Sequence, residues 1–110
     1  MYKTIPAVLL LAALATPASA AEQASTERGK ELFYSTELGT NHKGCANCHV
    51  NGDKLKAVAT YDDKHMARII NLCIRNMLKG KPLPFESDDM AALISYLRSI
   101  APPPPATRGG

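Results

Sequence analysis

The sequence predicts a small all-α domain, and two observations support this fold class. Two stretches in the second half of the chain repeat apolar residues at the period of a helix, and each follows a side chain that can cap a helix N-terminus. No stretch alternates apolar and polar residues convincingly enough for a strand, and no internal repeat is visible. With 110 residues in the chain, we expect a single domain with a thin hydrophobic core.

The first 20 residues have the pattern of a secretory signal peptide. Lys3 supplies a positive charge, residues 5–15 are nearly all apolar, and Ala18-Ser19-Ala20 matches the small residues of a cleavage site. The apolar run is shorter than the roughly 20 residues that a transmembrane helix needs. We therefore predict a cleaved signal over 1–20, a domain over 21–101, and export to the periplasm without stable membrane insertion.

A first helix is predicted from Ser25 or Thr26 to about Thr36, after a short mobile entry over 22–25. Acidic side chains near its start suit the helix dipole. The glycine-rich stretch 39–44 is expected to be a loop. Residues 50–61 show no clear period, and we expect a loop there as well.

The second helix is predicted to run from its cap Asp62 to about Lys79, with Gly80 at the C′ position. Its expected apolar stripe is formed by Met66, Ile70, Cys73 and Met77.

The third helix is predicted to begin after its cap Ser87 and to continue to about Ile100. Its expected buried face consists of Met90, Leu93, Ile94 and Leu97, with Tyr96 alongside. The proline-rich tail, 102–110, is expected to be extended and disordered.

The charge of the chain is modest, at +3, which excludes the strongly basic character of a nucleic-acid-binding domain. Its distribution is uneven, because residues 43–81 contain only three acidic side chains but a cluster of basic ones. We call this cluster the basic segment: Lys43, Lys54, Lys56, Lys64, Arg68, Arg75, Lys79 and Lys81.

The most specific motif is Cys45-Ala46-Asn47-Cys48-His49. In a Cys-x-x-Cys-His segment, two thiols can add to the two vinyl groups of one haem, and the adjacent histidine can then ligate the iron. The motif follows an export signal and uses two of the three cysteines in the chain. It therefore predicts covalent attachment of one haem c through Cys45 and Cys48, with His49 as an iron ligand.

Three other interpretations of these cysteines are weaker. A thioredoxin-like redox pair needs a βαβ context, which is absent. A zinc site could include Cys73 with His65 or His42, but these residues lack the paired spacing of zinc ligands. A structural disulfide between Cys45 and Cys48 would strain a very short loop.

The chain resembles the class I c-type cytochromes over nearly all of the predicted mature region. This resemblance rests on three motifs: Gly29-x-x-x-Phe33, the haem motif, and Leu93-x-x-Tyr96-Leu97. The resemblance implies an orthogonal bundle of three to four helices around the haem, single-electron transfer, and a contact between the first and last helices in which Gly29 faces Tyr96.

The same resemblance implies that a methionine is the second axial ligand. Met66, Met77 and Met90 are available, and we favour Met77 because it lies where the second helix is predicted to end. The remaining alternatives are Cys73, Lys64, His65, another side chain, or no protein side chain at all. Two features differ from the family pattern: Met77 is predicted to be helical, and no proline follows the motif before Pro82.

Cys73 opens a second functional hypothesis. The segment from Cys73 to Pro84 is similar to haem domains of thiosulfate-oxidising cytochromes, some of which use a cysteine iron ligand. The alternatives to an electron carrier are therefore a haem subunit of a sulfur-compound-oxidising system, with Cys73 near the iron, and a gas-binding haem protein with an open or labile sixth site. An ordinary buried thiol is the simplest role for Cys73.

The favoured hypothesis is a monomeric periplasmic electron carrier that is not itself an enzyme. The basic segment predicts brief encounters with redox partners that have an acidic docking surface, since complementary charge accelerates association.

Overall fold

The computed structural model describes residues 17–49 and 54–102. Over these ranges the chain forms four α-helices and one 3-10 helix, namely α1 (Pro17–Tyr34), α2 (Cys45–Cys48), η2 (Lys56–Thr60), α3 (Asp63–Asn76) and α4 (Asp88–Ile100). The described residues contain no strand, and the predicted all-α class is confirmed. The predicted disordered tail lies outside these ranges from residue 103 onward.

Helix α1 is longer than predicted at its N-terminal end. It begins at Pro17 and ends at Tyr34, so the expected non-helical entry over 22–25 is wrong. The reason is local, because proline is favoured at the first helical position and the next residues are rich in alanine and other good helix formers. The predicted cleavage point after Ala20 therefore lies within α1, and residues 1–16 of the predicted signal lie outside the described residues.

The predicted caps Asp62 and Ser87 are confirmed, whereas Ser25 and Thr26, predicted to begin the first helix, lie inside α1. The Asp62 carboxylate accepts a hydrogen bond from the His65 N–H at 2.7 Å, and the Ser87 hydroxyl accepts one from the Met90 N–H at 3.2 Å. Each bond satisfies a backbone donor that has no partner within its own helix. Local sequence signals thus placed the start of α3 and of α4 correctly.

The end of α3 differs from the prediction. The helix stops at Asn76, and the left-handed residue after it is Lys79, with φ 57°, rather than Gly80. Gly80 is needed for a different reason, since a Cβ placed on it would lie 1.9 Å from the Leu38 carbonyl oxygen. The glycine permits a close approach of two backbone segments, not a turn.

Residues 56–60, predicted to be loop, form η2. Leu55 and Val58 are buried and anchor this short element to the core. Two apolar residues three positions apart, within one turn, are too few to reveal a helical period in the sequence.

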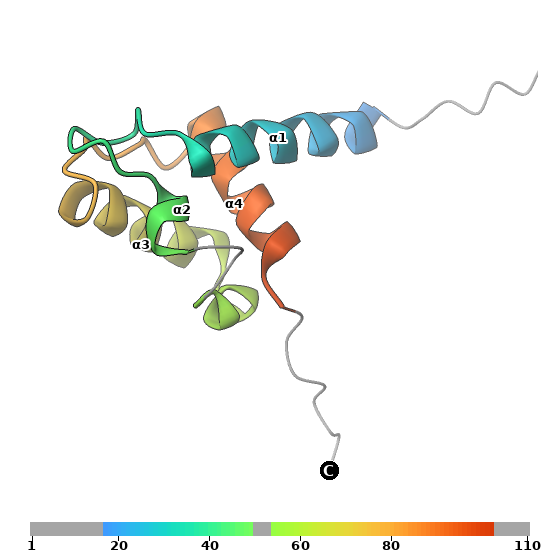
Figure 1. Cartoon of the computed structure of the whole chain (residues 1–110). Coiled ribbons are helices and arrows are strands. Elements are labelled where there is room, and N and C mark those ends of the chain that lie inside the picture. Colours follow the sequence, from blue (N-terminus) through green and yellow to red (C-terminus); the bar gives the residue numbers. More distant parts are fainter. Residues whose placement is uncertain (1–16, 50–53, 103–110) are drawn as a thin grey trace, which may run out of the picture.

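Helices α1 and α4 cross and make the most extensive helix–helix contact of the described residues (Figure 1). The crossing depends on Gly29, because a Cβ there would lie 1.9 Å from the Ala92 carbonyl oxygen and 2.7 Å from the Tyr96 Cβ. The rings of Phe33 and Tyr96 meet edge to face at 5.3 Å. The predicted contact between Gly29 and Tyr96 is confirmed.

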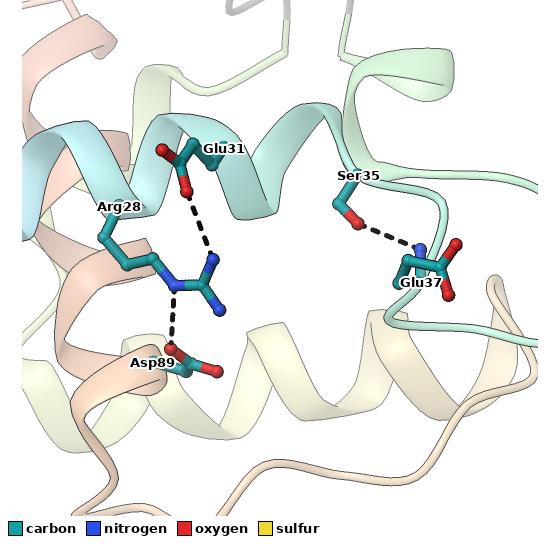
Figure 2. Close-up of polar contacts among 5 residues, drawn as sticks. All are labelled: Arg28, Glu31, Ser35, Glu37 and Asp89. Carbon is teal, nitrogen blue, oxygen red and sulfur yellow. Dashed lines mark hydrogen bonds and ion pairs between the residues drawn. The ribbon is translucent and has the colours of Figure 1, made fainter.

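An ion pair borders the same crossing. As Figure 2 shows, Arg28 on α1 reaches Asp89 in the first turn of α4 and also Glu31 on its own helix, both at 3.2 Å. These side chains are largely exposed, so solvent screens the pairs and their contribution to stability is small. The packing of Gly29, Phe33 and Tyr96 is the main cause of the crossing.

The buried faces of the two C-terminal helices were predicted with unequal success. All five predicted positions on α4 are buried. On α3 the buried face instead includes Met66, Ile70 and Ile74, while Cys73 is half-buried and Met77 is 57 % exposed. The predicted stripe is therefore less buried at its C-terminal half, where Met77 lies beyond the helix end.

Candidate functional site: a cavity lined by the Cys-x-x-Cys-His motif

The motif begins with the single helical turn α2. Its first backbone donor, the Gly44 N–H, is satisfied by the Asn47 side chain at 2.7 Å, and the His49 N–H returns to the Cys45 carbonyl at 3.0 Å. Gly44 is buried, and a Cβ on it would lie 2.4 Å from the Ser35 carbonyl oxygen. This close contact between Gly44 and Ser35, the residue after α1, places the start of the motif beside the end of that helix.

The side chains of the motif line a cavity of about 400 Å³. The walls come from the end of α1, from α2, from the segment around η2, and from α3 and α4. They are mainly aliphatic and aromatic. The lining residues are Phe33, Gly44, Cys45, Cys48, His49, Lys54, Leu55, Val58, Tyr61, Met66, Ile69, Ile70, Cys73, Met77, Leu78, Leu93 and Leu97.

The cavity separates the three methionine candidates. Met77 and Met66 both line it, whereas Met90 is fully buried and is not among the lining residues. Met66 is 2 % exposed and forms part of the core, while Met77 is 57 % exposed and lies at the C-cap of α3. Of these three methionines, Met77 therefore has the side chain that is packed least against the rest of the protein.

All three cysteines line the same cavity, and their thiols are free. Burial and, second to it, the neighbouring Cys73 together raise the pKa of the Cys45 thiol to about 11. Burial also raises the pKa of Cys73, with Cys48 as a second cause. Desolvation and like charge both disfavour the thiolates of Cys45 and Cys73, so these two thiols are held in their neutral form at neutral pH.

The alternative zinc ligands are not gathered around Cys73. Neither His42 nor His65 lines the cavity. His65 instead packs its ring against Tyr61 at 4.3 Å. In the part of the chain that the structure describes, no group of three or more His, Cys, Asp or Glu side chains is placed to hold a metal ion.

Several residues of the site region were missed in the sequence. Leu55, Val58 and Tyr61 line the cavity from a segment that shows no helical period. Asn71 is buried on α3, and its side-chain amide forms two 2.8 Å hydrogen bonds with the backbone of Leu83. These two hydrogen bonds hold the proline-containing connector 81–87 against α3. No local sequence pattern predicts them.

The donor set and the walls of the cavity fit a covalently held haem. A macrocycle with a large apolar surface needs apolar walls, two thiols that reach its edge, and an imidazole. One cavity presents these features through residues that follow one another in the chain, with two thioethers and a further thiol also on its walls.

The chain matches no protein-family model, no curated protein and no solved structure. None of the described helices is long and apolar enough to span a membrane.

Proposed function

We propose that this protein is a periplasmic single-electron carrier with one haem c. The observation that carries the proposal is that Cys45, Cys48, His49 and Met77 line one apolar cavity. In this proposal the helices form a cytochrome c-like orthogonal bundle around the prosthetic group, and the mature protein is a monomer.

Each residue has a defined role in the proposed site. Cys45 and Cys48 form the thioether bonds, His49 is the proximal iron ligand, and Met77 is the distal ligand. When bound, the haem supplies a one-electron couple between ferric and ferrous iron. The surrounding apolar side chains exclude water, and no catalytic acid, base or nucleophile is required.

Met77 is favoured over Met66 for a physical reason. Met66 is part of the packed core, so turning its sulfur toward a ligand would leave a void in the interior. Met77 is exposed beyond the last turn of α3, and its long flexible side chain can move with little loss of packing.

The basic segment supports an acidic redox partner. All eight of its side chains are exposed, and one of them, Lys54, lines the cavity. Positive charge around the site would steer a negatively charged partner toward it. No enzymatic activity is needed for this role.

One observation favours a second candidate function. Cys73 lines the same cavity as the motif, so a haem subunit of a sulfur-compound-oxidising system, with Cys73 near the iron, is the alternative. A Cys73→Ser variant distinguishes the two functions. In an electron carrier the substitution leaves the reduction potential and the behaviour toward thiosulfate unchanged. In the sulfur-oxidising alternative it abolishes the response to thiosulfate.

The test of the proposal is to purify the exported protein, weigh it and record its spectra. We expect a mass increased by one haem that denaturation does not remove, and in the ferric form the red absorption band of thioether-to-iron charge transfer. A mass equal to that of the polypeptide contradicts the proposal. Ready binding of carbon monoxide by the reduced protein, without that band, indicates a gas-binding protein with an open sixth site.

A further inference from the structure

The end of α3 is tied to the loop that precedes the motif. Three successive carbonyl groups, those of residues 77–79, each accept a hydrogen bond from Thr40 or Asn41. The Asn41 side-chain amide donates to Met77 at 2.9 Å, the Thr40 N–H to Leu78 at 2.9 Å, and the Thr40 hydroxyl to Lys79 at 2.7 Å. Residues 77–79 follow the last helical residue, Asn76, so their carbonyls have no partner within α3, and a distant loop supplies the partners.

Asn41 connects both sides of the cavity through one side chain. Its Nδ2 donates to the Met77 carbonyl, while its Oδ1 accepts from the Lys43 N–H at 3.3 Å, two residues before Cys45. Both halves of a rigid, planar amide are therefore occupied, one on the segment that leads into the motif and one on the residue that we assign as distal ligand.

Two glycines make this connection possible. A Cβ on Gly39 would lie 2.1 Å from the Leu78 carbonyl oxygen, and one on Gly80 would lie 1.9 Å from that of Leu38. The two backbones are thus in direct contact, which brings Asn41 within hydrogen-bonding reach of Met77.

The Met77 side chain is not held by packing, since more than half of it is exposed. Its position depends on its backbone, which is held by two hydrogen bonds: the N–H donates to the Cys73 carbonyl at 2.9 Å, and the carbonyl accepts from Asn41. The first bond belongs to the helix end, and the second comes from outside it.

We propose that Asn41 is a positioning residue that holds Met77 at the haem site. This inference rests on the proposed function. Loss of the Asn41 donor frees the carbonyl of Met77, so the sulfur occupies the iron-ligating position for a smaller fraction of the time. An added ligand then competes with it more successfully.

The experiment uses the haem-loaded exported protein and measures imidazole binding to its ferric form. Asn41→Ala removes both hydrogen bonds, whereas Asn41→Asp keeps an acceptor for Lys43 and loses only the donor to Met77. We expect both variants to bind imidazole about fivefold more tightly than the original protein, the effect of about one hydrogen bond. Faster amide hydrogen exchange at residues 77–80 provides a second readout that does not involve ligand exchange.

The matched control is Asn76→Ala, one residue before Met77. Asn76 is exposed, and its side chain makes no hydrogen bond to any described residue. We expect its imidazole affinity to stay within about twofold of the original, less than one hydrogen bond contributes. Circular dichroism and haem content establish that all variants fold and carry haem.

Met77→Ala separates failure of the inference from failure of the ligand assignment. If this variant binds imidazole no more tightly than the original protein, Met77 is not the distal ligand, and both the assignment and the inference are overturned. If Met77→Ala binds more tightly but Asn41→Ala and Asn41→Asp behave like Asn76→Ala, only the role of Asn41 is overturned.

Discussion

Cys73 has the most distinctive environment of the single residues. It lies one helical turn before Met77, lines the cavity of the motif, and is half-buried. In the proposed protein Cys45 and Cys48 are consumed as thioethers, which leaves Cys73 as the single reactive thiol. Its chemistry can therefore be observed without interference from the other two.

Alkylation of Cys73 should be slow at neutral pH. Burial raises the pKa of this thiol, so at pH 8 the folded protein contains less thiolate than an exposed cysteine would have, and thiolate is the nucleophile. The rate of iodoacetamide labelling, followed by mass spectrometry, should rise with pH and continue to rise above pH 9. A labelling midpoint below pH 9 contradicts this expectation, and Cys73→Ser should not be labelled at all.

At the scale of elements, the crossing of α1 and α4 organises the fold. It brings Phe33, which lines the cavity, against Tyr96, and it aligns Leu93 and Leu97 toward the same cavity. The contact is close because Gly29 has no side chain. The absence of a side chain at Gly29 on α1 thus influences how the walls of the cavity are arranged.

Gly29→Ala should destabilise the fold strongly. The added methyl group would overlap the Ala92 carbonyl, and relief requires the helices to separate, at a cost of about 2–3 kcal/mol. For a domain of this size, that cost lowers the Tm by about 10–20 °C. Thermal unfolding followed by circular dichroism measures the effect. Lys30→Ala, the exposed neighbour on the same helix, is the control and should change the Tm by only a few degrees.

At the scale of the whole molecule, the apolar cavity is large for so small a chain. Its aliphatic and aromatic walls remain in contact with water unless a group fills it, and burial of apolar surface is the dominant favourable term in folding. A group that fills this cavity would therefore stabilise the fold.

A Cys45→Ala/Cys48→Ala double variant should lose its cooperative thermal transition, because it cannot retain a covalent haem as core. Far-UV circular dichroism of the exported protein measures this loss. Cys73→Ala is the matched cysteine substitution and should retain a cooperative transition. Equal melting curves for the double variant and the original protein would contradict a covalently attached group as part of the core.

Electron exchange with an acidic partner should slow as salt increases. The Debye length falls from about 30 Å at 0.01 M to about 8 Å at 0.15 M ionic strength, so salt screens the attraction between the exposed basic segment and a distant partner. We expect a decrease of about tenfold in the second-order rate, measured by stopped flow. Lys54→Gln at the cavity should reduce the low-salt rate more than Lys30→Gln on α1. Equal effects of the two variants would contradict docking at the cavity.

Features with local causes could be predicted from the amino-acid sequence. The caps Asp62 and Ser87, the buried face of α4 and the all-α class follow from neighbouring residues, and the structure agrees with them. The Cys-x-x-Cys-His motif likewise identifies candidate haem residues through spacing alone, and that identification remains a prediction.

The folded structure was needed for the features that depend on residues far apart in the chain. It determined that Gly80 serves a backbone contact with Leu38, that α3 buries Ile74 rather than Met77, and that Asn41 holds the Met77 carbonyl from 36 residues away. A cap or a helical period acts over one or two turns, whereas these contacts form only when separate segments meet. Their partners cannot be read from neighbouring residues.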